Sequence, residues 1–115
     1  MERPMTETAP IAAPVDIPHL QMLTMRDPMI EREVLALFGD RAAAALRAIL
    51  KADVPGRRRE AAHRLAGAAK AIGAWELAAI AGEIEVQETL TVSTAEALSR
   101  SMTEVVDYVT LRLAS

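Results

Sequence analysis

Apolar residues recur every three or four positions in several long segments of this chain, and this period constrains the possible folds more than any other feature. The clearest segment includes Ile30, Val34, Phe38, Ala42, Ala45 and Ile49. Such spacing places apolar side chains on one face of an α-helix. Asp27 and Pro28 just before it are typical of a helix start, as N-cap and first helical residue. We therefore predict one continuous helix over residues 28–52, with Gly39 inside it.

Two further segments with this period are predicted to form a helical hairpin. The first runs over about residues 57–72 and the second over about residues 74–88, with Gly73 between them. Glycine readily adopts the left-handed conformation in which helices commonly end. Pro55 and Gly56 have the composition of a turn, so we expect them to precede the hairpin as a loop.

A fourth long helix is predicted after residue 92, where Ser93 and Glu96 have the spacing of a capping box. Its apolar face comprises Leu98, Met102, Val105, Val106, Val109 and Leu113. Asp16 can cap a short helix that precedes residue 24. Four amphipathic helices joined by short loops favour an all-α fold, namely an antiparallel up-and-down four-helix bundle with a short extra N-terminal helix.

A chain of 115 residues is long enough for one hydrophobic core. We expect one domain over residues 16–115, preceded by a flexible tail, because residues 1–15 contain three prolines and no hydrophobic period. Aromatic residues are only 3% of the chain, so Leu, Ile, Val, Met and Ala must fill the core. The helices can cover one another, so we expect a monomer.

Composition and charge argue against several classes of protein. The absence of cysteine excludes disulfides and thiolate metal sites. A net charge of −3 does not favour nucleic-acid binding, which depends on excess Lys and Arg. No apolar run approaches the ~20 residues needed to span a bilayer, and the first residues do not resemble a signal peptide. We therefore expect a cytoplasmic protein that binds neither membrane nor nucleic acid.

His63 is distinctive because its neighbours on the predicted helix are small. If Leu65 faces the core, His63 points away from it, since two residues correspond to about 200° of rotation. Gly67 lies about 40° from His63, one turn further on, and Ala66 lies about 60° to the other side. We predict an exposed imidazole beside a nearly bare surface, which another molecule's backbone or a phosphoryl group can approach closely.

Three basic residues lie near this histidine. Arg59 and Lys70 point within about 40° of the direction of His63, and Arg64 follows it directly. Helical side chains lean toward the N-terminus, so Lys70 leans toward the histidine whereas Arg59 leans away. Lys70 is therefore the predicted group that stabilises an anion on the imidazole.

Spacing alone leaves the role of His63 open, because exposed histidines are common on alanine-rich helices. No second histidine lies at i+3 or i+4, so we predict no metal site. The sequence shows no Asp or Glu partner to orient the ring, which argues against hydrolytic catalysis. His19 and the arginine run at residues 57–59 are interpreted as solvated, and Trp75 and Phe38 as core residues.

The sequence around His63 resembles the central motif of histidine-containing phosphotransfer (HPt) domains of bacterial two-component phosphorelays. That motif reads His-x-Leu-Lys-Gly, followed by a hydrophobic residue and glycine; His63, Leu65, Gly67 and Ile72-Gly73-Ala74 match it. The similarity covers most of residues 16–113 and implies a four-helix bundle. The family's lysine, which the resemblance implies helps to hold the phosphoryl group, is replaced by Ala66. We expect Lys70 to substitute in part and the partner to supply most of the neutralising charge.

The resemblance implies a phosphorelay carrier without independent enzymatic turnover. His63 would accept a phosphoryl group from the aspartate of a receiver domain and pass it to another receiver. Receivers, and a hybrid sensor kinase, are the implied partners; Mg²⁺ is expected on the receiver, so the chain itself needs no cofactor. The expected docking surface comprises Gly67, Ala66, Ala62 and Ala69, ringed by Arg59, Arg64 and Lys70. The alternatives are a non-phosphorylated receiver- or kinase-binding adaptor of the same fold and a structural helical adaptor.

Overall fold

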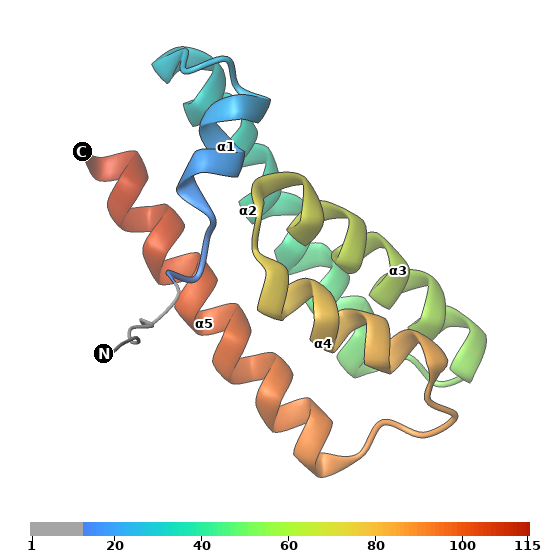
Figure 1. The fold of residues 1–115 in the computed structure, drawn as a ribbon. Coiled ribbons are helices and arrows are strands. Elements are labelled where there is room, and N and C mark those ends of the chain that lie inside the picture. The colour runs from blue at the N-terminus through green and yellow to red at the C-terminus, as the bar shows by residue number, and fades with distance from the viewer. Residues whose placement is uncertain (1–12) are drawn as a thin grey trace, which may run out of the picture.

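The structure, a computed structural model, describes residues 13–115, which form five α-helices and contain no strand (Figure 1). The helices are α1 (Ile17–Leu23), α2 (Pro28–Lys51), α3 (Pro55–Ile72), α4 (Trp75–Val86) and α5 (Val92–Ala114). The predicted all-α class and the short helix before the long ones are confirmed. Within residues 13–115 no helix has the length and apolar character to cross a membrane.

α3 occupies a central place in the packing. It contacts α2 on one side and α4 on the other, whereas α5 contacts α4 and α2, and α1 contacts α3. Figure 1 shows α3 and α4 side by side, with α2 behind them. Apart from Thr24, the largest fully buried side chains are aliphatic: Leu20, Leu35, Ile49, Leu65, Ile72, Leu77, Ile84, Leu98, Val15 and Val105. Alanines between these residues allow the helices to approach closely, as the scarcity of aromatic side chains predicted.

Helix α2 begins and ends as its sequence indicates. The side chain of Asp27 accepts hydrogen bonds from the amides of Met29 and Ile30, and Pro28 is the first helical residue. The helix continues through Gly39 to Lys51. One continuous helix is therefore confirmed. Gly39 does not interrupt it, because a single glycine costs only about 1 kcal/mol relative to alanine.

Three other helix ends differ from their predicted positions by a few residues. Pro55 is the first residue of α3 rather than part of a loop, since its missing N–H costs nothing there. α4 ends at Val86 rather than near residue 88. α5 is capped by Thr91, which accepts from the amide of Thr94, so the predicted capping box at Ser93 is wrong.

The predicted tail is described only from residue 13 onward, and residues 1–12 lie outside the described part of the chain. Val15, the last residue of that predicted tail, is completely buried in the core. Asp16 follows and caps α1, with its side chain accepting a hydrogen bond from the amide of His19. The predicted cap is confirmed, and the ordered fold includes the residue just before it.

The turn between α3 and α4 holds α1 in place. Gly73 adopts the left-handed conformation, with φ of 83°, and its carbonyl accepts a 2.9 Å hydrogen bond from the amide of Asp16. Trp75 donates from Nε1 to Oδ2 of Asp16 at 2.9 Å, and His19 donates from Nε2 to the carbonyl of Ala71 at 3.1 Å. The rings of His19 and Trp75 meet edge to face, with centroids 4.9 Å apart.

These contacts show that the sequence-based interpretations of Trp75 as a core residue and of His19 as a solvated residue are wrong. Trp75 is about half exposed, at 48%, because its indole covers the α1 contact rather than the central core. His19 is partly buried and hydrogen-bonded instead of fully solvated. Phe38, by contrast, is a core residue as predicted. Hydrogen bonds from Trp75 and from the amide of His19 also hold the pKa of Asp16 below its ordinary value.

Two arginines are more constrained than their sequence positions suggest. Arg58 is buried and donates to the carbonyl of Glu88, so the run at residues 57–59 is not wholly solvated. Arg112 near the end of α5 forms two hydrogen bonds, of 2.7 and 3.0 Å, with the carboxylate of Glu31 in the first turn of α2. This bidentate pair raises the pKa of Arg112 and joins helices that are distant in sequence.

Candidate functional site

His63 lies on the outer face of α3. Its side chain is 76% exposed, whereas Leu65, two residues further along the same helix, is completely buried. The rotation of about 100° per residue separates the two directions. The predicted exposure of His63 is confirmed.

The imidazole of His63 has a carboxylate partner on the neighbouring helix. Nδ1 of His63 lies 2.8 Å from Oε2 of Glu85 on α4, and the side chain of Glu85 is 34% exposed. An ionised carboxylate only accepts hydrogen bonds, so Nδ1 carries the proton in this contact. In the neutral ring Nε2 then holds the lone pair, and no group among residues 13–115 is hydrogen-bonded to it. The nucleophilic nitrogen is therefore the one that Glu85 leaves without a hydrogen-bond partner, on a ring that is largely exposed.

The expectation that no acidic residue orients His63 is wrong. Glu85 is 22 positions away, beyond the reach of any helical spacing rule. One signal does exist in the sequence: His63 precedes Gly73 by ten residues and Glu85 follows it by twelve. A hairpin that turns at Gly73 brings those two positions side by side on its two helices.

Small residues leave the surface beside His63 partly bare. Gly67 is exposed, and a Cβ built on it would meet no atom within 4 Å beyond its chain neighbours and the backbone of its own helix. Gly67 thus leaves its side of the histidine without a side chain, as the helical spacing predicted.

The three alanines assigned to the docking surface are instead core residues. Ala62 and Ala69 are fully buried and Ala66 is 5% exposed. Because α3 packs against both α2 and α4, its buried arc is wider than that of a helix with one neighbour. A lysine side chain at position 66 would begin inside this packed arc, so the substitution by alanine fits the local packing.

Two shallow hollows border His63. The first lies between α2 and α3 and is lined by Arg41, Ala44, Ala45, His63, Arg64, Gly67, Ala68 and Ala71. The second lies between α3 and α4 and is lined by Arg59, Glu60, His63, Arg64, Glu85 and Val86. His63 and Arg64 belong to both hollows, so they form the ridge that separates them.

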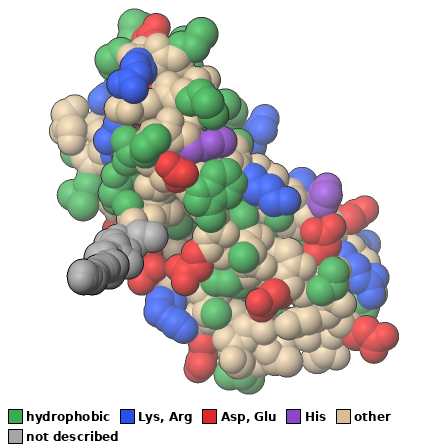
Figure 2. Space-filling view, in the orientation of Figure 1, with side chains coloured by type: hydrophobic (Ala, Val, Ile, Leu, Met, Phe, Trp, Pro, Cys, Tyr) green, Lys and Arg blue, Asp and Glu red, His purple; other side chains and the backbone are tan. Residues whose placement is uncertain are grey.

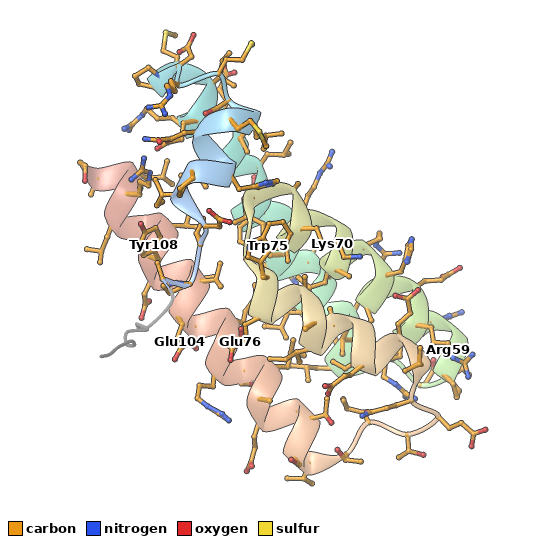
Figure 3. The ribbon with its side chains drawn as sticks, in the orientation of Figure 1. Arg59, Lys70, Trp75, Glu76, Glu104 and Tyr108 are labelled. Carbon is orange, nitrogen blue, oxygen red and sulfur yellow. The ribbon has the colours of Figure 1, made fainter. Side chains whose placement is uncertain are left out.

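The basic residues around the site are distributed differently from the prediction. Figure 3 shows Arg59 and Lys70 toward opposite ends of α3, both directed to solvent. Lys70 lines neither hollow, whereas Arg64 lines both and Arg41 on α2 lines the first. Arg41 was missed because helical spacing within α3 says nothing about residues on α2. Figure 2 shows basic and acidic side chains interleaved on the face over α3 and α4.

The site carries no group of metal ligands. Within the described residues, no three His, Asp or Glu side chains lie close enough together to hold a metal ion. His63 and Glu85 form a pair, and the other charged groups beside them are Arg59, Glu60, Arg64 and Arg41. The chemistry available here is that of an oriented, exposed imidazole with arginines nearby.

Comparison with known proteins supplies an independent observation. The family model described as "Hpt domain" matches residues 33–108. The matched segment includes His63, Glu85 and Arg41, and it extends from α2 to α5. The comparisons with curated proteins and with solved structures gave no match.

Proposed function

The chain belongs to the Hpt domain family, and we propose that it is a phosphorelay carrier in which His63 holds the phosphoryl group. Family membership supports a role in phosphotransfer with receiver domains. The observation that carries the assignment to His63 is its geometry: the ring is exposed, bonded to Glu85 through Nδ1, and open at Nε2.

The proposed reaction is an in-line transfer to Nε2. The Nε2 lone pair of neutral His63 forms a bond to the phosphorus of a receiver's aspartyl phosphate, and the bond from phosphorus to the aspartyl oxygen breaks with its electron pair. Return of the group to a second receiver reverses these steps. Such transfer depends mainly on positioning and charge stabilisation. Glu85 contributes the positioning, since it fixes both the tautomer and the direction of the ring.

The positive charge that stabilises the phosphoryl group is proposed to come from two sources. Arg64 and Arg41 line the hollow beside His63 and lie on the same side as Gly67, which makes them better placed than Lys70. The receiver is proposed to bring Mg²⁺ and its own lysine, as the family resemblance implies. Gly67 gives the partner backbone room to approach, and Ala66 takes no part because it is buried.

We propose that α2, α3, α4 and α5 form an antiparallel up-and-down bundle, since each contacts the next and α5 contacts α2. The chain is proposed to act in the cytoplasm as a monomer, with no turnover of a substrate on its own.

Transfer of radiolabelled phosphate tests the assignment. The full chain is mixed with each phosphorylated receiver domain of the host, and label on the chain is followed over time. The wild type and His19→Gln are expected to accept label, whereas His63→Gln is expected to accept none. Label that persists in His63→Gln would refute the assignment of the acceptor.

A non-phosphorylated adaptor of the same fold is the second candidate. The observation that favours it is Ala66, which stands where the family motif has a lysine and is only 5% exposed. Binding to a receiver without accepting its phosphoryl group would support the adaptor. Because His63 and Glu85 form the geometry of an acceptor, transfer remains the function that the site supports best.

A further inference from the structure

Glu85 offers His63 a negative charge as well as a hydrogen bond. The contact joins a carboxylate oxygen to Nδ1 at 2.8 Å, which is within the range of charge-assisted hydrogen bonds. An amide side chain would also orient the ring, because its oxygen is an acceptor as well. A carboxylate at position 85 therefore does more than orient the ring, because it also places a negative charge beside it.

We propose that Glu85 keeps the Nδ1 proton on phosphorylated His63 and so holds the phosphoryl group in its readily transferable form. This inference rests on the proposed function of His63. When Nε2 gains the phosphoryl group, Nδ1 keeps its hydrogen and the ring becomes positively charged. No proton has moved, and the electron pair of the broken bond stays with the donor's oxygen. The carboxylate of Glu85 stabilises the positive ring across the existing hydrogen bond.

Retention of this proton decides how easily the phosphoryl group leaves. From the protonated ring Nε2 departs as neutral imidazole, which is a good leaving group. From a ring that has lost the Nδ1 proton it would depart as an imidazolate anion, which is a poor one. Glu85 thus favours rapid onward transfer and a short-lived phosphohistidine over stable storage.

The other charged residues that line the hollows beside His63 are Arg59, Glu60 and Arg64 on α3 and Arg41 on α2. The arginines oppose a positive ring, and Glu60 has no hydrogen bond to the imidazole. Glu85 is the group in contact, and it lies on α4, the helix packed against this side of α3. The expected effect is limited because the side chain of His63 is 76% exposed, and water weakens an exposed ion pair.

A test without any receiver separates this inference from the proposed function. The full chain is phosphorylated with phosphoramidate, which needs no partner protein, and loss of phosphohistidine is followed by ³¹P NMR. His63→Gln identifies any signal from His19. At pH 8 we expect Glu85→Gln to lose the group about three- to fivefold more slowly than the wild type, with the rates converging near pH 5 as both rings become protonated.

Matched variants distinguish charge from structure. Glu83→Gln makes the same charge change on α4, but Glu83 lines the hollow toward α5. This variant should therefore lose phosphohistidine at the same rate as the wild type. Glu85→Asp keeps the negative charge, so its rate of phosphohistidine loss should be closer to the wild-type rate than that of Glu85→Gln. ¹⁵N NMR of the phosphorylated ring should show that Nδ1 loses its proton at a lower pH in Glu85→Gln. Equal rates for the wild type and Glu85→Gln at pH 8, or equal slowing in Glu83→Gln, would overturn the proposal whether or not receivers transfer to the chain.

Discussion

Trp75, the first residue of α4, donates a 2.9 Å hydrogen bond from its indole Nε1 to Oδ2 of Asp16, the N-cap residue of α1. The same aspartate donates its backbone amide to the carbonyl of Gly73. One residue therefore begins α1 and fastens it to the turn that ends α3. The α3–α4 hairpin, which brings Glu85 to His63, is held at this turn by α1.

Asp16 should make the stability of the chain depend on acid pH. Its folded-state pKa is lower than the ordinary value of 3.8, mainly because Trp75 and the amide of His19 donate to the carboxylate. This contribution to the free energy of unfolding is present above that ordinary value and is lost as the pH falls through the lower folded-state value. Urea midpoints measured from neutral pH downward should fall more in the wild type than in Asp16→Asn. An identical acid dependence of the two proteins would contradict this role.

Two glycines on α3 and at its end should respond oppositely to alanine. At Gly73, φ is 83° and an added Cβ would lie 2.9 Å from Cβ of Asp16, so Gly73→Ala should lower the free energy of unfolding by roughly 1 kcal/mol or more. At Gly67 an added Cβ meets nothing, so Gly67→Ala should raise it by about 0.5–1 kcal/mol. Urea titration of both variants measures the contrast. A neutral Gly73→Ala would show that the turn tolerates a side chain.

The size of residue 67 should control access of a receiver to His63. Gly67→Ala is expected to transfer close to the wild-type rate, whereas Gly67→Leu places a branched side chain beside the imidazole and should slow transfer on the order of a hundredfold. The measurement is the initial rate of label transfer, with helicity followed by circular dichroism. Gly39→Leu is the control, since an added Cβ there also meets nothing within 4 Å, and Gly39 lies in the hollow between α2 and α5, away from His63. A normal rate for Gly67→Leu would show that access along this side is not required.

Arg41 and Arg64 should speed transfer by attracting the phosphorylated partner. Both line the hollow beside His63, and exposed charges act over about 10 Å at 0.1 M salt. Arg41→Gln and Arg64→Gln should each slow transfer several-fold at low ionic strength, and the difference should shrink as salt is added.

Arg47→Gln provides the matched control for this pair. Arg47 is an exposed arginine on the same helix as Arg41, but it does not line the hollow. Its transfer rate should be close to that of the wild type. Equal slowing in all three variants would point to net charge instead of local placement.

The sequence was sufficient to predict the helices and the exposure of His63. Periodic apolar residues identify the face that each helix buries, and rotation from Leu65 places His63 on the opposite side. The ends of the helices were less predictable because local signals compete. Pro55 fits both a turn and a first helical residue, and the hydroxyls of Thr91 and Ser93 are both suitable caps.

The composition of the site depended on which helices pack against α3. Ala62, Ala66 and Ala69 are small enough to lie on a surface or in a close helix contact, and nothing in their spacing distinguishes the two. Whether these alanines are exposed or buried depends on which other helices pack against α3. Arg41 comes from α2 and Glu85 from α4, so neither could be assigned by the geometry of α3 alone.

The sequence by itself determined an exposed histidine beside an open glycine on an amphipathic helix, since a helix's own rotation fixes the relative directions of its side chains. Only the tertiary structure decided which ring nitrogen is open and which charges surround it. The hairpin that turns at Gly73 sets Oε2 of Glu85 2.8 Å from Nδ1 of His63 and thereby leaves Nε2 free. Contacts across 22 residues arise from helix packing, and helical periodicity contains no information about them.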